Sequence, residues 1–355
     1  MQGRGTRFYG LDALRGVAAL GVVFWHWQHF FFHGTNPGKP TPADLPLHGI
    51  FSLLYARGWM AVDLFFILSG FIFFRLYAEP IGDRQVSAWR FAWLRFSRLY
   101  PLHLLTLVLV AAIGAGFVYG HNDRWHFGLQ LLFASSWGLE QGDSFNGPVW
   151  SVSVEVLVYA LFYLLCRRIR LSPGWLLAIA LASLLALKAL YSPLGRGVGG
   201  FFLGGWLCAV YSLWAGLPDA ERRARWTAWI AMAGWIATCA VHYAAAWAPP
   251  KWLGSLWPVL LFATTVLALA LNEAGLPNCL RRLAWLGDIS YSSYLLHFPL
   301  QLVVVLSFGY FGVADTVFSQ PVFMLGFFGV LVVLSWFSHR AFEVPVQNRL
   351  RALLP

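Results

Sequence analysis

Long apolar runs recur along almost the entire chain, and this pattern constrains the fold more than any other feature. About ten runs have the 17 to 25 residues that a helix needs to cross a bilayer. They cover residues 11–32, 50–74, 99–119, 149–166, 175–191, 198–214, 226–247, 252–271, 289–311 and 321–340. The sequence therefore predicts an all-α polytopic membrane protein of about ten transmembrane helices. Residues 127–137 are apolar but too short to span, and we interpret them as re-entrant or interfacial.

The composition agrees with a membrane protein. Hydrophobic residues make up 59% of the 355 residues and charged residues only 11%, whereas a soluble domain is about a quarter charged. The first run contains Asp12, Arg15 and His26 and has no small-residue cleavage site, so we expect it to stay in the mature protein. We predict an integral-membrane domain over residues 8–345 and a short cytoplasmic tail over 346–355.

The positive charges indicate an orientation. If both termini are cytoplasmic, six of the 25 Lys and Arg residues fall on the outer side and the other 19 on the inner side. The outer six are Lys39, Arg57, Arg124, Lys188, Arg196 and Lys251. This bias predicts that both termini are cytoplasmic. We expect a multi-pass protein of the cell's inner (plasma) membrane. The net charge of +10 is scattered over short loops, so we expect no nucleic-acid partner.

Two polar residues of the first run, Arg15 and His26, lie about 16 Å apart on one face of a helix. Arginine offers a permanent charge for phosphate or carboxylate near the cytoplasm, and histidine can exchange a proton near neutral pH at the far end. The structural alternative is an arginine that extends to the interface and a histidine that is hydrogen-bonded in the core.

Two further histidines, His29 and His33, follow His26 at helical spacing, and three imidazoles on one face would suit zinc. No carboxylate or cysteine completes a ligand motif, and the four cysteines form no CxxC pair. We therefore predict no metal site and exposed positions for His29 and His33.

The second run places Asp63 in its outer half, where the carboxylate would orient His26 or pair with Arg57. Both are supporting roles. Gly70 in the same run would allow another helix to approach closely.

Arg95 and Arg98 share a helical face in the inner loop before the third run. A phosphorylated ligand would dock there through charge-assisted hydrogen bonds. The alternative is contact with lipid headgroups.

The run over 149–166 places Ser151, Glu155 and Tyr159 on one face. Glu155 lies about 9 Å from the start of this helix, which resembles the expected depth of His26 and is compatible with a His26–Glu155 pair. Ser151 and Ser153 are supporting candidates.

The run over 289–311 carries Ser290, Tyr294 and His297 on roughly one face. This polar stripe would line the same cavity as His26. The alternative is a set of interhelical hydrogen bonds, each contributing about 0.6 to 2 kcal/mol.

Five segments occur in the order LDALRGVAALGVVFWHW, VDLFFILSGFIF, RFSRLYPLH, NGPVWSVSVE and SYLLHFPL. Together they resemble the acyltransferase-3 family of membrane O-acyltransferases, which includes O-antigen and exopolysaccharide acetyltransferases. The resemblance covers nearly the whole chain, although residues 171–285 match no motif. It is specific because several short signatures follow one another in the right order.

The resemblance implies transfer of an acetyl group from cytoplasmic acetyl-CoA, without a permanently bound cofactor, to a sugar hydroxyl at the outer face. By the same resemblance, His26 is the catalytic residue, Glu155 its partner, and Arg15, Arg95 and Arg98 bind the donor. The expected partners are acyl-CoA, a carbohydrate or lipid-linked glycan acceptor, and membrane lipids. We expect acceptor specificity to reside in the membrane domain or in a partner protein.

These residues suggest a mechanism in which His26, assisted by Glu155, deprotonates the acceptor hydroxyl or carries the acyl group transiently. The acyl group is acetyl or a longer chain. The competing interpretation is a transporter of an anion or a lipid-linked sugar. The two halves show no paired Gly/Pro-interrupted helices, which weakens that interpretation.

Overall fold

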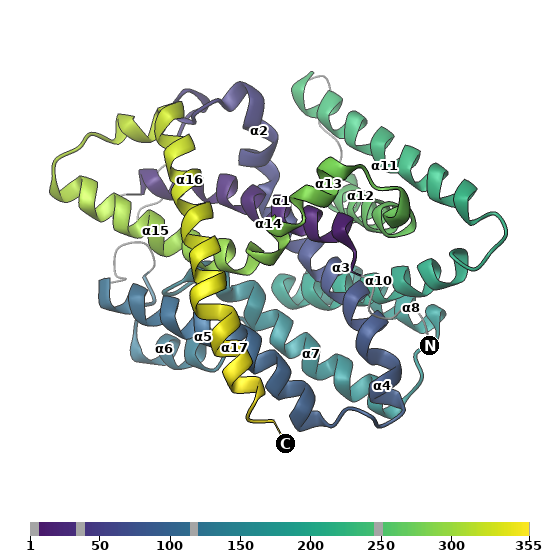
Figure 1. The fold of residues 1–355 in the computed structure, drawn as a ribbon. Helices are drawn as coiled ribbons and strands as arrows, with labels where there is room; N and C mark the ends of the chain where they lie inside the picture. The colour runs from purple at the N-terminus through teal and green to yellow at the C-terminus, as the bar shows by residue number, and fades with distance from the viewer. Residues whose placement is uncertain (1–6, 33–39, 114–119, 245–250, 355) are drawn as a thin grey trace. The chain divides into compact units, whose positions relative to one another are not determined.

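The computed structural model describes residues 7–32, 40–113, 120–244 and 251–354, apart from the side chains of 251–255. Every regular element within these ranges is a helix (Figure 1), which confirms the all-α prediction. His33 and the end of the predicted run 99–119 lie outside the described residues.

Seventeen α-helices follow one another along the described parts of the chain. They are α1 (Tyr9–His26), α2 (His48–Arg57), α3 (Ala61–Phe73), α4 (Glu79–Gly82), α5 (Ala88–Ile113), α6 (Arg124–Leu131), α7 (Trp150–Arg168), α8 (Pro173–Ala182), α9 (Lys188–Leu190), α10 (Ser192–Trp214), α11 (Ala220–Tyr243), α12 (Lys251–Leu271), α13 (Asn278–Leu283), α14 (Trp285–Asp288), α15 (Ser290–Tyr310), α16 (Pro321–Ser338) and α17 (Val344–Arg351). Tighter or wider helical turns connect several of them, among them Trp27–Phe31 after α1 and the π-helical turn His339–Glu343 before α17.

Seven helical segments of the described chain are long and apolar enough to cross a membrane. They are His48–Gly82, Ala88–Ile113, Gly147–Arg168, Pro173–Leu190, Ser192–Trp214, Ser290–Tyr310 and Pro321–Arg351. The chain is therefore a multi-pass membrane protein.

The predicted spans at α1, α11 and α12 are not among the seven. Charged residues at the start of α1 and α11 reduce the apolar character of those helices, and the described apolar part of α12 is short. The count of ten and the orientation stay predictions.

Apolar side chains on the outside of the helices agree with a lipid environment. On α16, Val322, Leu325, Val333 and Phe337 are each more than half exposed. Soluble monomers rarely expose so continuous an apolar surface, whereas the hydrocarbon core of a bilayer requires one.

The helices group into two compact units, each assembled from three segments of the chain. Unit 1 comprises Met1–Ala18, Met60–Val86 and Val158–Gly287, and unit 2 comprises Ala19–Trp59, Ser87–Leu157 and Asp288–Pro355. The division falls within α1 and α7, so both helices contribute residues to each unit. The predicted domain over residues 8–345 thus holds two groups of packed helices, and its predicted end falls inside α17.

Close contact between α3 and α10 organises unit 1. A Cβ atom at Gly70 would meet the main-chain carbonyl of Phe201, and one at Gly204 would meet that of Ile67. Glycine at both positions therefore lets the two backbones approach each other, as predicted for Gly70.

An aromatic cluster forms the core of unit 2 around the end of α1. Trp27 and Phe30 are almost fully buried against Phe318 and Phe327. The Trp27 indole Nε1 donates a hydrogen bond to the Phe318 carbonyl at 3.1 Å, which satisfies the single polar group of that side chain. The residue next to Trp27, His26, is consequently anchored at a defined position.

Substituting alanine for Gly70 tests the contact between α3 and α10. We expect Gly70→Ala to lower the thermal unfolding midpoint, because overpacking costs about 1–3 kcal/mol. Gly326→Ala on α16 is the matched control, since a Cβ there meets no atom within 4 Å. Alanine favours the helix at such an open position, so the control should unfold at the same or a higher temperature. A Gly70→Ala protein as stable as the control would contradict the contact.

Candidate active site

His26 ends α1 and pairs with a second histidine on α15. The His26 Nδ1 atom lies 2.9 Å from Nε2 of His297, and the two rings stack with centroids 4.9 Å apart. One turn further along α15, the Gln301 Nε2 atom donates to the His26 main-chain carbonyl at 3.0 Å. His297 and Gln301 are almost fully buried, so one face of α15 holds both the ring and the backbone of His26.

The second ring nitrogen of His26, Nε2, takes no part in the contact with His297. Nε2 forms no hydrogen bond with a residue in the described ranges, and the His26 side chain is only partly buried. A substrate hydroxyl can therefore approach this atom, which is the requirement for a general base.

The prediction that His29 is exposed is wrong. His29 is 9% exposed and stacks on the His26 ring at 5.0 Å. The chain leaves the α-helix at His26 and continues as a 3-10 turn, in which residues three apart lie above one another. No three His, Cys, Asp or Glu side chains of the described residues are grouped so that they would hold a metal ion.

The predicted polar stripe of α15 continues from His297 to Tyr294. The Tyr294 hydroxyl donates to the Pro148 carbonyl at 2.8 Å and lies 2.7 Å from Ser151 Oγ. Ser151 Oγ also lies 3.4 Å from the same Pro148 carbonyl, so the two hydroxyls share one main-chain acceptor and either can donate to the other. The structure thus brings four of the predicted residues into one polar region of unit 2: His26, His297, Tyr294 and Ser151.

Glu155 interacts with the start of α15. Glu155, Glu343 and Arg98 each interact electrostatically with Tyr291 of α15. Tyr291 and His297 are six residues apart, which is about 9 Å along a helix. The described ring contacts of His26 are with His29 and His297, and a His26–Glu155 pair stays a prediction.

Three further polar residues of this region, Glu343, Gln301 and Asn146, were not predicted from the sequence. Glu343 accepts a short hydrogen bond from Ser292 Oγ, and its side chain is 10% exposed. Asn146 is fully buried and donates to the Leu295 carbonyl at 3.1 Å. The spacing of Gln301, four residues after His297, could have revealed it; Glu343 and Asn146 gave no periodic signal.

The two arginines of α5 differ in their surroundings. Arg98 is exposed and forms no ion pair with the described residues, so its guanidinium is available to an anion. Arg95 is half-buried, and its guanidinium lies 5.9 Å from the Phe91 ring. Binding of the donor by either residue stays a prediction.

Arg15 takes part in a contact network of unit 1. Its guanidinium lies 3.0 Å from the Asp12 carboxylate and donates to the Gly287 carbonyl at 2.8 Å. These bonds connect α1 to α14, which supports the structural interpretation of Arg15. The predicted role in donor binding is not required to explain its position.

Asp63 has a different partner from those predicted. Its carboxylate accepts a hydrogen bond from Arg196 Nε at 2.7 Å, and both side chains are largely buried. Neither Arg57 nor His26 is a partner of Asp63 in the structure. The close approach of α3 and α10 explains this result, because it brings Arg196 on α10 beside Asp63.

Ser153 anchors the chain segment before α7. Its hydroxyl accepts a hydrogen bond from the Ser136 amide at 3.1 Å, and its carbonyl accepts one from Trp137 Nε1 at 3.0 Å. This supports a structural role for Ser153.

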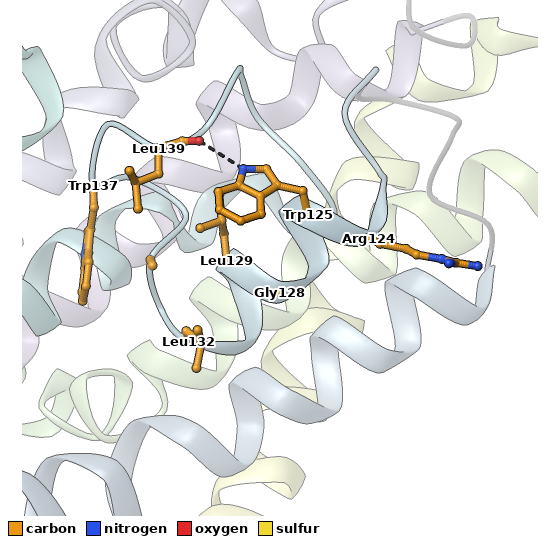
Figure 2. A pocket seen from close by; sticks show the side chains of 8 residues that line it. Arg124, Trp125, Gly128, Leu129, Leu132, Trp137 and Leu139 are labelled. Atoms are coloured by element: carbon orange, nitrogen blue, oxygen red, sulfur yellow. Dashed lines mark hydrogen bonds between the residues drawn. The ribbon is translucent and has the colours of Figure 1, made fainter.

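A pocket of about 570 Å³ lies over α6 (Figure 2). Trp125, Trp137, Leu129 and Leu132 contribute to its apolar lining, and Arg124 is its one charged lining residue. It contains none of the predicted site residues, and arginine alone does not supply acid-base chemistry. Exposed tryptophans of this kind are typical of a membrane–water interface.

The model of the family described as "Acyltransferase domain" (Acyl_transf_3) matches residues 8–340. The chain belongs to this acyltransferase family. All predicted site residues lie inside the matched range, whereas Glu343 lies just beyond it.

Several curated relatives are similar to this acyltransferase-family chain. Protein 2 in the picA locus of Rhizobium radiobacter is 39% identical over 30% of this chain and 45% of its own length. Acyltransferase MdmB of Streptomyces mycarofaciens is 31% identical over 52% of this chain and 46% of its own. Peptidoglycan O-acetyltransferase OatA of Listeria monocytogenes is 24% identical over 82% of this chain and 49% of its own. The chain spans about half the length of these relatives, and no solved structure matches it.

The buried ion pair between Asp63 and Arg196 gives a stability prediction. Removing one partner leaves an uncompensated charge, so Asp63→Leu and Arg196→Met should each destabilise the protein by about 3–5 kcal/mol. The double variant should be closer to the wild type than either single variant. Thermal unfolding of the four proteins is the measurement, and additive losses would contradict the pairing.

Proposed function

We propose that this chain is a membrane O-acetyltransferase that transfers an acetyl group from acetyl-CoA to a hydroxyl of a cell-surface glycan. The observation that carries the proposal is His26, whose Nδ1 and backbone are held by α15 while its Nε2 stays available. Membership of the acyltransferase family and the similarity to a peptidoglycan O-acetyltransferase support this chemistry.

In the proposed reaction, His26 Nε2 takes the proton from the glycan hydroxyl while the hydroxyl oxygen attacks the thioester carbonyl. The carbon–sulfur bond then breaks, and the imidazolium returns the proton to the leaving thiolate. Because the proton leaves as the oxygen attacks, no free alkoxide has to form first. A general base of this kind typically accelerates a reaction about 10²–10⁴-fold.

The donor binds, in this proposal, from the side of α5. Arg98 is exposed and close enough to Tyr291 to act on it, so a phosphate held by Arg98 would lie at one end of the polar stripe of α15. Glu155 and Glu343 act on the same tyrosine. We assign Glu155 to this end of the site, where it balances the positive charge. The predicted orientation places this end on the cytoplasmic side.

Full-length protein reconstituted in liposomes tests the function. Acetyl-labelled CoA is supplied on one side and a glycan acceptor on the other, and label on the acceptor is measured. A transporter would move the acceptor or donor without joining them. Absence of label on every glycan class offered, with intact protein, would contradict the proposal.

Replacing His26 should abolish turnover without unfolding the protein. We expect His26→Gln to lower kcat at least about 10²-fold, because the general base is lost. His103→Gln is the matched control, since His103 is a fully buried histidine that bonds the Gln130 carbonyl and does not contact His26. Near-normal turnover by the His26 variant would exclude it from the mechanism.

Replacing Arg98 should weaken donor binding selectively. Arg98→Gln removes a charge-assisted hydrogen bond of about 1.5–3 kcal/mol, so the KM for acetyl-CoA should rise about tenfold or more. A short acetyl thioester without the nucleotide should be much less affected. Arg90→Gln, at another exposed arginine of α5, controls for the lost net charge. Equal effects on both donors would identify Arg98 as structural.

A further inference from the structure

The hydrogen bond between the two stacked histidines contains one proton. The ring that carries this proton determines whether His26 Nε2 can act as a base. A neutral imidazole has one N–H and one lone pair. If the shared proton belongs to His26 Nδ1, the lone pair of His26 is on Nε2 and faces the substrate. If it belongs to His297, His26 presents an N–H there and cannot accept a proton.

The proposed role of His26 requires the first arrangement. A general base needs its lone pair on the atom that meets the substrate, and that atom is His26 Nε2. The proton between the rings then belongs to His26 Nδ1, and His297 Nε2 accepts it. His297 Nδ1 is buried and has no hydrogen-bond partner among the described residues, so no second contact fixes the other tautomer.

The two histidine rings differ in their exposure. His297 is 0% exposed, whereas His26 is partly accessible, so only His26 can meet a substrate. The Gln301 bond to the His26 carbonyl fixes the backbone but not the ring. His29 stacks on the His26 ring, and His297 is the described residue that hydrogen-bonds it, so the orientation of the ring nitrogens depends on His297.

We infer that His297 is a positioning residue that accepts the Nδ1–H of His26 and so keeps the lone pair on His26 Nε2. During transfer, Nε2 takes the proton of the acceptor hydroxyl and passes it to the thiolate released from the thioester. His297 stays neutral and stabilises the transient imidazolium through the same hydrogen bond. This inference rests on the proposed function, and the tautomer can be measured independently of activity.

Kinetics of two His297 variants test the role. Gln keeps an acceptor oxygen near the position of Nε2, whereas Leu has none. His297→Leu should lower kcat by about 10²–10⁴-fold with little change in the KM for acetyl-CoA, and His297→Gln should restore most of this loss. His103→Leu controls for the removal of a buried imidazole. Equal losses for His297→Leu and His103→Leu, or no recovery with Gln, would overturn the inference.

Nitrogen NMR of the full-length protein gives a second readout that does not depend on activity. With ¹⁵N-labelled histidine rings, the spectrum of the wild type minus that of His26→Gln identifies the His26 signals. We expect Nδ1 protonated and Nε2 unprotonated in the wild type, and the reverse in His297→Leu. An Nε2–H tautomer in the wild type would overturn the inference even if the enzyme is active. The expected tautomer without transferase activity would support the positioning and contradict only the proposed function.

Discussion

The free-energy cost of burying polar groups among apolar helices determines how the helices of this protein pack within each unit. A bilayer offers no water to satisfy them, so the buried polar side chains that join helices within each unit are held by partners. In unit 1 the Asp63 carboxylate is held by Arg196. In unit 2 the hydroxyls of Tyr294 and Ser151 and the imidazoles of His26 and His297 are paired. These pairs fix which helices lie together within each unit.

Within unit 2, the polar pairs are arranged along one helix. α15 presents Tyr291, Tyr294, His297 and Gln301 on successive turns, and these side chains meet α5, α7 and the end of α1 in that order. Charged groups gather at the Tyr291 end of this helix, and the His26–His297 pair lies at the other end. An acyl-CoA donor is arranged in the same way, with charged phosphates at one end and an uncharged thioester at the other. This match links the helix packing to the proposed acyl transfer.

The aromatic core gives the site its rigidity. Trp27 and Phe30 follow His26 directly and are almost fully buried in the cluster around Phe318. Because protein interiors are closely packed, the end of α1 cannot rotate freely, and the 3-10 turn stacks His29 on His26. A side chain at the end of a helix is otherwise subject to fraying. The anchored tryptophan prevents this.

The sequence alone determined the all-α membrane class, because apolar runs of spanning length are a local property of the chain. It also determined the stripe of Tyr294 and His297 and the close contact at Gly70, since helical periodicity places them. Only the tertiary structure decided the partners: His297 for His26, and Arg196 for Asp63. Partner choice depends on the direction and offset of neighbouring helices, which periodicity within one helix does not encode.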